Sequence, residues 1–251
     1  MNINLIKFDT DIGKTKPETV RAETACPFCD VEHLTGILDV EGDIIFLRNK
    51  YNVIEGADQF VLIEGSECKS DMPAYSPEKI RRVIRMGIRH WQELLACGKY
   101  QEVLFFKNYG LMSGGTIKHP HMQLVGFPHL KSELLFDEAE LRGIVIANRD
   151  GVELNISNCP RVGFGELNIV VEGGGNLDTL ADFLQVAVHY VKNFFNKKIT
   201  SYNIFFYRRA EKIFAKVMPR YATSPYFVGY NIHFLPNNIE RIAAEIKQRY
   251  F

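Results

Sequence analysis

The sequence predicts an α+β fold that is built from two related halves. Short apolar runs of strand length alternate with two longer stretches of helical spacing, which is the mixture that this class requires. The order strand, helix, strand, loop, strand occurs before residue 130 and again, in a degenerate form, after it. Antiparallel strands with a helix on one side would give each half its own sheet. We place the halves at residues 1–135 and 136–251 and expect them to form one compact body.

Local patterns place the elements of the first half. Residues 1–25 are polar and have no clear period, so we expect an extended arm there. Ser76-Pro77-Glu78 predicts a helix start, because it offers a capping hydroxyl, a proline at the first helical position and an acid near the positive end of the dipole. Gly98 would close that helix. Apolar runs predict strands at 43–49, 60–65, 102–108 and 118–127, with a loop at 108–118.

The second half repeats this order. A strand at 166–174 would be followed by a helix at about 178–195 and by strands at 201–209 and 212–221. A hairpin at 143–157 would turn at Asp150-Gly151, and a short helix would follow Pro236. Four basic residues near the last two strands suit either a solvated face or contact with a substrate: Arg208, Arg209, Lys216 and Arg220.

Composition and charge exclude several classes of protein. Of the 251 residues, 46% are hydrophobic, and 30 basic side chains balance 30 acidic ones. A net charge of zero provides no field for binding nucleic acid or an anionic membrane. The sequence has no apolar run of membrane-spanning length, and MNINLIKFDTD has no signal-peptide pattern, so we expect a cytoplasmic protein.

Residues 118–127, KHPHMQLVGF, give the clearest sign of chemistry. Side chains alternate along a strand, so His119, His121 and Gln123 would share one face. The polar outer face of a half-exposed strand is one explanation, but two clustered histidines favour a site with a nucleophile or metal ligands. Pro120 removes one ladder donor, which suits an edge or the mouth of a sheet.

The loop before this strand favours a phosphate site. Its glycines let backbone N–H groups approach an anion closely, and its hydroxyls add further donors. Most glycine-rich loops are simple turns, but a donor-rich loop beside an imidazole suits attack on phosphorus. The candidate contacts are Asn108, Gly110, Ser113, Gly114, Gly115 and Thr116.

Two cysteines near the N-terminus have the spacing of half a zinc site. Cys26 and Cys29 form a CxxC pair, and Cys68 and His119 are candidates for the other two ligands. A Cys3His set would be closed and structural. A thioredoxin-like redox pair is an alternative, although no βαβ unit surrounds CPFC, and a pair of merely buried cysteines is another.

Together, these motifs resemble a known family. CPFC, the segment FKNYGLMSGGTIKHPHMQ (106–123) and the degenerate second copy are similar to galactose-1-phosphate uridylyltransferases of the histidine-triad (HIT) superfamily. The motifs in this order span about half of the chain and resemble a small bacterial branch that is shorter than the true uridylyltransferases. The resemblance implies two tandem HIT-like halves, with the catalytic motif in the first.

The resemblance also implies roles for individual residues. In the HPHxQ motif, His119 would bind zinc and His121 would be the nucleophile. Gln123 would hold a phosphoryl oxygen, and Asn49 falls where the family has an asparagine near the nucleotide. The family often has a histidine ligand at the position of Cys68, and zinc accepts either residue type.

Two departures from the family pattern limit the expectation. Lys107 stands where the uridylyltransferases usually have Glu, and the second half lacks the Glu and three histidines that hold a second metal there. We therefore expect one structural Zn²⁺ and no second metal.

The implied reaction is nucleotidyl transfer through a covalent nucleotidyl-histidine. The substrate would be a nucleotide sugar or a related nucleoside diphosphate compound, and the acceptor a sugar phosphate or phosphate. Gln123 cannot titrate, unlike the third histidine of hydrolases of the superfamily, so it favours transfer over hydrolysis. A nucleotide-sugar phosphorylase or a nucleotide hydrolase is the alternative enzyme, and a zinc-stabilised nucleotide-binding module without catalysis is the alternative of another class. Relatives often dimerise, so the resemblance allows a homodimer.

Overall fold

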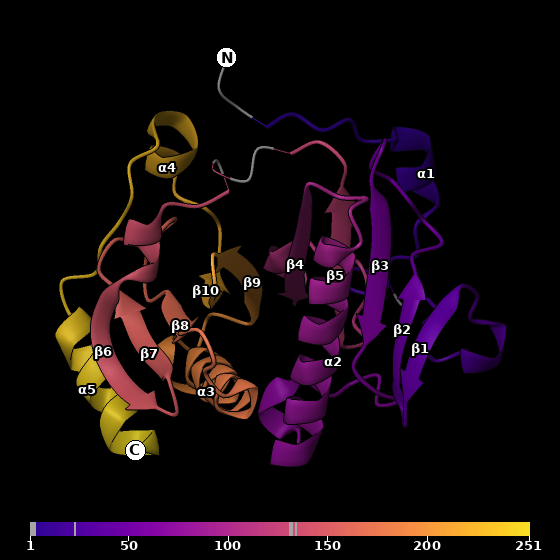
Figure 1. Cartoon of the computed structure of the whole chain (residues 1–251). Helices are drawn as coiled ribbons and strands as arrows, with labels where there is room; N and C mark the ends of the chain where they lie inside the picture. Colours follow the sequence, from indigo (N-terminus) through magenta and orange to yellow (C-terminus); the bar gives the residue numbers. More distant parts are fainter. Residues whose placement is uncertain (1–3, 23, 131–132, 134) are drawn as a thin grey trace. The chain divides into compact units, whose positions relative to one another are not determined.

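The computed structural model describes residues 4–22, 24–130, 133 and 135–251, and the chain divides into two units (Figure 1). The first unit comprises Met1–Asp71 and Arg85–Leu135, and the second comprises Met72–Ile84 and Phe136–Phe251. The strands pair antiparallel within each unit, and helices pack on them. This arrangement confirms the predicted α+β class with two related halves.

The first unit orders its strands β1-β2-β3-β5-β4. Their bounds are β1 Ile37–Glu41, β2 Ile44–Arg48, β3 Asp58–Ile63, β4 Glu102–Tyr109 and β5 His121–Phe127. β1 is mostly exposed and therefore lacks the buried apolar run from which the other strands of this half are predicted in the sequence. An edge or the mouth of the sheet was expected at Pro120, and the second of these fits. β5 lies between β3 and β4, and His119 and Pro120 come directly before its first residue.

Among the described residues of the first half, the α-helices are α1 (Thr10–Thr15) and α2 (Pro77–Ala96). α1 corrects the expectation of a fully extended arm. It forms because Asp9 caps it, accepting hydrogen bonds from the N–H groups of Asp11 and Ile12 at 2.9 and 2.8 Å. Six residues are too few for a helical period to show in the sequence.

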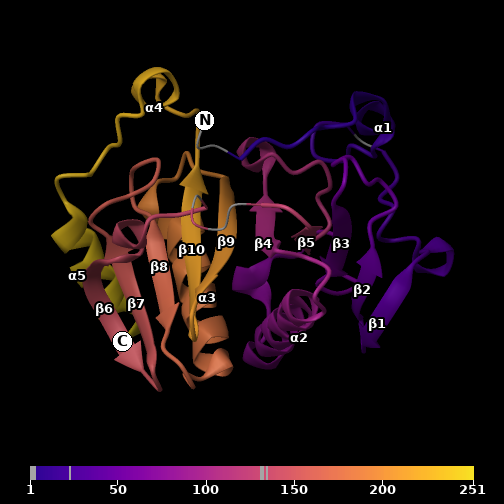
Figure 2. The same cartoon turned by 45° about the horizontal axis from the view of Figure 1, so that its top comes forward.

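α2 covers one face of the sheet (Figure 2). Gly87 packs so closely that an added Cβ would lie 2.6 Å from the ring of Phe105. Trp91 anchors the same helix, because its Nε1 donates to the main-chain oxygen of Val103 at 2.7 Å. Since side chains alternate along β4, the neighbouring Phe106 points to the opposite face, which carries the site described below.

The second unit repeats the strand order of the first. Its order β6-β7-β8-β10-β9 corresponds to β1-β2-β3-β5-β4, which confirms the degenerate repeat. The strands are β6 Gly143–Arg149, β7 Val152–Ser157, β8 Leu167–Val171, β9 Ser201–Arg209 and β10 Lys212–Arg220. The helices are α3 Leu177–Tyr190, continued by a π-helical turn Val191–Phe195, then α4 Pro225–Tyr230 and α5 Ile239–Tyr250. No helix in the described ranges is both long and apolar enough to cross a membrane.

Lys216 of β10 corrects one expectation about the basic residues. Its side chain is 0% exposed, and its Nζ lies 2.8 Å from a carboxylate oxygen of Glu166. The same Nζ donates to the main-chain oxygen of Glu140 at 2.8 Å. Lys216 therefore belongs to a closed ion pair, and it lies on neither a solvated face nor a cleft.

Candidate functional site

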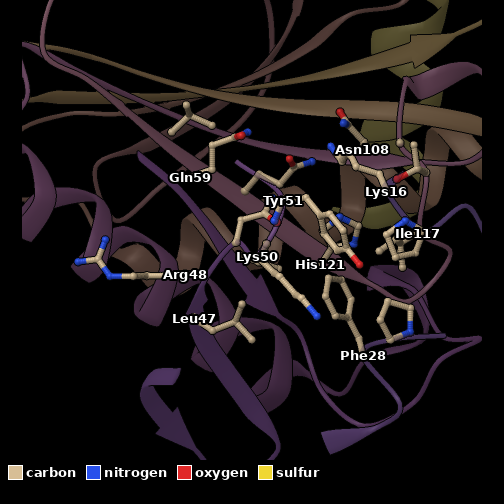
Figure 3. A pocket seen from close by; sticks show the side chains of 18 of the residues that line it. Lys16, Phe28, Leu47, Arg48, Lys50, Tyr51, Gln59, Asn108, Ile117 and His121 are labelled. Atoms are coloured by element: carbon tan, nitrogen blue, oxygen red, sulfur yellow. The ribbon is translucent and has the colours of Figure 1, made fainter. Parts of the chain in front are cut away.

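A cavity of about 540 Å³ lies in the first unit, and Figure 3 shows side chains that line it. Because Phe106 of β4 lines it, the cavity lies on the face of the sheet opposite α2. Strands β3, β4 and β5 give it an apolar wall that includes Val61, Leu104, Phe106, Val125 and Phe127. Polar side chains reach it from the N-terminal arm, from the end of β2 and the loop after it, from β4 and from the loop before β5: Lys16, Arg48, Asn49, Lys50, Tyr51, Asn108 and Thr116. A cavity with apolar walls and a few convergent polar groups is the usual form of a small-molecule site.

His121, the first residue of β5, faces this cavity and is 6% exposed. Its Nδ1 lies 2.8 Å from the main-chain oxygen of His119, so Nδ1 carries the proton and donates it. Nε2 keeps its lone pair and bonds to none of the residues that the structure describes. Burial lowers the pKa of His121 to about 4, and the positive charges of Lys107 and Lys16 act in the same direction. The ring is therefore neutral at physiological pH.

Gln123 follows two residues later on the same face of β5. It is partly buried, and its side-chain amide makes no hydrogen bond with the described residues. Phe28, from the CPFC segment, stands edge-on to His121, with a centroid distance of 5.3 Å. The same ring lies 6.0 Å from His119, again edge-on, so Phe28 connects the cavity wall to the cysteine segment.

Cys26, Cys29, Cys68 and His119 come together, with ligand atoms within 4.8 Å of one another. The Sγ atoms of Cys26 and Cys29 lie 3.7 and 3.5 Å from His119 Nδ1. Zinc bonds of about 2.3 Å to sulfur and 2.0 Å to nitrogen, at the tetrahedral angle, would separate these atoms by about 3.5 Å. The cluster could therefore hold a metal ion such as zinc.

Surrounding groups orient the cluster. His119 Nε2 donates to the main-chain oxygen of Gly65 at 2.7 Å, which leaves Nδ1 as the ligand atom. Burial raises the pKa of Cys26, and burial together with the neighbouring thiols of Cys29 and Cys26 raises the pKa of Cys68 to about 12. The thiols of Cys26 and Cys68 resist ionisation in this way until a cation stabilises the thiolates, which is the behaviour expected of metal ligands.

The glycine-rich loop contributes part of its length to the cavity. Gly114, Gly115 and Thr116 line it, and their role as phosphate contacts stays a prediction. Gly110 and Ser113 are not among its described lining residues; instead, Ser113 Oγ donates to the main-chain oxygen of Gly110 at 2.7 Å. Gly110 and Gly114 have φ angles of 83° and 85°, in the left-handed region that favours glycine. These interactions fix the shape of the loop.

The N-terminal arm also reaches the cavity, which the sequence patterns did not indicate. The N–H groups of Thr19 and Val20 donate to the main-chain oxygen of Thr116 at 2.7 and 3.1 Å. These bonds hold the arm beside the loop and bring Lys16 close to Asn108 and His121 (Figure 3). Burial lowers the pKa of Lys16. A lysine in an aperiodic polar arm gives no sequence signal of such a position.

The loop after β2 places further polar groups at the cavity. Asn49 Oδ1 accepts a hydrogen bond from the N–H of Tyr51 at 2.9 Å, and the N–H of Asn49 donates to the main-chain oxygen of Gln59 at 2.8 Å. Sequence reasoning singled out Asn49 and missed its neighbours Lys50 and Tyr51, which line the same cavity. Only their position next to Asn49 in the sequence could have indicated that they line the cavity.

Lys107, one of the departures from the family pattern, lies on the α2 side of the sheet. It forms an ion pair with Glu64, and both side chains are 0% exposed. The alternation along β4 puts Phe106 and Asn108 on the cavity side instead. Lys107 therefore acts on His121 through its charge and not as a wall of the cavity.

Comparisons with known proteins find matches to one family and to several solved structures of similar fold. Family models described as "Domain of unknown function (DUF4931)", N-terminal and C-terminal domains, match residues 8–130 and 133–251. A DUF4931 family protein from Bacillus cereus ATCC 10987 is 37% identical, covering 84% of this chain and 98% of its own, with a TM-score of 0.77. A uridylyltransferase is 15% identical over 97% of both chains, with a TM-score of 0.72. An Arabidopsis thaliana ADP-glucose phosphorylase with bound ADP-glucose is 14% identical over 95% and 94%, with a TM-score of 0.71.

Some of these matches show the family of the chain, and others show only its fold. No curated protein matches the sequence. The low identities to the uridylyltransferase and the phosphorylase show a shared fold, which confirms the resemblance to the galactose-1-phosphate uridylyltransferase-like proteins of the HIT superfamily at that level. The family models cover both halves, and the Bacillus cereus protein matches over most of its length, so the chain belongs to the DUF4931 family.

Proposed function

We propose that the chain is a nucleotidyltransferase that acts on a nucleotide sugar or a related nucleoside diphosphate compound through a covalent nucleotidyl-histidine on His121. One observation carries this proposal: His121 lines the cavity, and its Nδ1–H donates to the carbonyl of His119 at 2.8 Å, which leaves the lone pair of the imidazole on Nε2. The fold shared with a uridylyltransferase, and with a phosphorylase that holds ADP-glucose, supports this reaction class.

The first step would be attack by His121 Nε2 on the α-phosphorus. A phosphorus–nitrogen bond forms while the bond from that phosphorus to the bridging oxygen breaks, and the phosphorylated group leaves with the electron pair. The ring gains positive charge, which the main-chain oxygen of His119 stabilises through the Nδ1–H bond. An oxygen of the acceptor phosphate then attacks the same phosphorus and releases neutral imidazole.

Charge on the non-bridging oxygens would be stabilised by groups that line the cavity near His121. Gln123 offers an amide donor, Thr116 a hydroxyl and Lys16 a positive charge. Preorganised donors of this kind contribute about 2.7–4 kcal/mol each in the oxyanion holes of acyl-transfer enzymes. Because an amide cannot exchange protons with water, Gln123 favours a phosphate-bearing acceptor over hydrolysis.

We assign the cysteine cluster to one structural zinc ion held by Cys26, Cys29, Cys68 and His119. Four protein ligands close a tetrahedral site and leave no position for water, so the ion would supply rigidity. His119 would then hold its carbonyl in register with His121. The chemistry belongs to residues 1–135, because β10, the counterpart of β5 in strand order, carries no histidine.

The test is mass spectrometry of the protein after incubation with a panel of nucleotide sugars. We expect a mass gain of one nucleoside monophosphate, located on His121, and discharge of this adduct by a sugar phosphate. Discharge by inorganic phosphate alone would favour the phosphorylase, which the shared fold with ADP-glucose phosphorylase keeps as the second candidate. Tight nucleotide binding without any adduct would overturn catalysis in favour of a zinc-stabilised binding module.

A further inference from the structure

We infer that Gln59 reads a carbonyl oxygen on the nucleobase, so that the site takes keto bases, uracil or guanine, in preference to the amino bases cytosine and adenine. The inference rests on the proposed function, because it assumes that a nucleotide occupies the cavity. Gln59 lines that cavity from β3 and is 7% exposed.

The register of β3 and β5 sets the distance of Gln59 from the reacting centre. Gln59 pairs with Val125, and Ile63, four residues further along β3, pairs with His121. At the rise of a strand, four residues span about 13 Å. Figure 3 shows Gln59 and His121 in separate parts of the same cavity. A nucleotide with its α-phosphorus at His121 would therefore extend its base toward Gln59.

The orientation of the Gln59 amide follows from its hydrogen bonds. Its side-chain oxygen accepts the N–H of Val53 at 2.7 Å, so the side-chain nitrogen is the group that remains for the cavity. That nitrogen makes no hydrogen bond with any residue in the described ranges. The main chain of Gln59 is also fixed, because its carbonyl accepts the N–H of Asn49 at 2.8 Å.

The surroundings make this donor selective. The strands around it contribute apolar side chains to the cavity wall, namely Val61, Val125, Phe106 and Phe127, while Arg48 and Asn49 line the cavity from the end of β2 and the loop after it. In such a wall, an amide donor loses hydrogen bonds to water and requires an acceptor from the ligand. Uracil O4 and guanine O6 are acceptors at the position where cytosine and adenine carry an amino group, which would oppose a second donor.

A substitution can reverse the hydrogen-bonding sense of this one group. In Gln59→Glu, one carboxylate oxygen still accepts the N–H of Val53, while the other replaces the donor by an acceptor. The matched control is Gln101→Glu. Gln101 Oε1 also accepts a main-chain N–H, that of Leu130 at 3.1 Å, but Gln101 is exposed and is not among the cavity's described lining residues.

The experiment offers UDP-glucose with CDP-glucose, and GDP-glucose with ADP-glucose, at equal concentrations, and identifies the adduct by mass spectrometry of the His121 peptide. We expect the keto-base adduct to exceed the amino-base adduct by about tenfold or more in the wild type and in Gln101→Glu. We expect Gln59→Glu to remove or reverse this ratio. A purely structural role for Gln59 would lower stability and leave the ratio unchanged, and that result would overturn the inference.

A second measurement separates failure of the inference from failure of the proposed function. In His121→Gly, which cannot form the adduct, calorimetry would compare the binding of UMP with CMP and of GMP with AMP. The same preference, lost in the double variant with Gln59→Glu, would support base reading by Gln59 even where no adduct forms in the wild type. Equal affinities for all four nucleotides would overturn base reading, while adduct formation in the wild type would still support the transferase.

Discussion

The main-chain oxygen of His119 lies 2.8 Å from His121 Nδ1, while the side chain of His119 belongs to the cluster with three cysteines. One residue thus takes part in both sites, with its imidazole in the cluster and its carbonyl on the candidate nucleophile. Whatever fixes the position of His119 also fixes the tautomer of His121, because only the Nδ1–H form can donate to that carbonyl.

His121→Gly should abolish formation of the nucleotidyl adduct and reduce transfer below detection. It should leave the zinc content equal to that of the wild type, because no atom of residue 121 belongs to the cluster. Metal analysis and mass spectrometry of the same sample measure both effects. His129→Gly, at an exposed histidine, is the control. Wild-type transfer in the residue 121 variant would show that the nucleophile is another group.

Gln123→His should raise the fraction of the adduct that water removes. A histidine there can exchange protons with water, whereas the amide that now lines the cavity cannot. The measurement is the ratio of free nucleoside monophosphate to transfer product at a fixed acceptor concentration. An unchanged ratio would count against the role of Gln123 in excluding hydrolysis.

Cys68→His should retain zinc, and Cys68→Ala should lose it. Zinc binds thiolate and imidazole in similar tetrahedral sites, so the first change preserves the ligand number and the second removes one ligand. Metal analysis after dialysis, with thermal unfolding of the same samples, gives both readouts. Cys97→Ala, at an exposed cysteine outside the cluster, should change neither. A wild-type zinc content in Cys68→Ala would remove Cys68 from the ligand set.

Lys107→Met should reduce the free energy of unfolding by about 3–5 kcal/mol, because it removes one member of an ion pair whose side chains are both 0% exposed. The double variant Glu64→Leu with Lys107→Met should lose much less, since it removes both buried charges together. Lys99→Met is the comparison: Lys99 pairs with Asp58 at the surface, where its side chain is 58% exposed, and should cost less than about 1 kcal/mol. Chemical denaturation measures all three, and equal losses for Lys107 and Lys99 would contradict the difference in burial.

Lys16 should make substrate affinity sensitive to alkaline pH. Burial lowers the pKa of Lys16, so its positive charge, present at pH values below that pKa, is lost at a lower pH than for an ordinary lysine. We expect KM to rise as pH increases through this range. Lys16→Arg should move the rise to higher pH, because a guanidinium stays charged. Lys16→Met should raise KM about tenfold at neutral pH and remove the rise of KM at alkaline pH. If the pH profile of KM in Lys16→Met were identical to that of the wild type, Lys16 would be excluded from substrate binding.

Much of the first half could be predicted because its signals are local. The cap and proline at Ser76-Pro77 mark the start of α2, and the apolar runs mark β2 to β4. The motif CPFC and the motif HPHxQ point to the residues that meet in the metal cluster and at the cavity, because few residue types bind zinc or attack phosphorus.

The missed features depend on partners that lie far away in the sequence. Lys16 reaches the cavity through hydrogen bonds between its arm and the residue 116 carbonyl. Lys216 can be buried because its Nζ donates a hydrogen bond to the carboxylate of Glu166, 50 residues earlier, whose negative charge balances its own. Gln59 is one polar residue beside an apolar run, and only its bond to Val53 shows which end of its amide faces the cavity. No local pattern contains such information.

Phe28 stands edge-on to both imidazoles, and the next residue, Cys29, is exposed. A reagent that attacks this thiol from solution would therefore loosen the ring that forms part of the cavity wall. Under the proposed function, protein prepared with chelators or without reductant is expected to lose transfer activity.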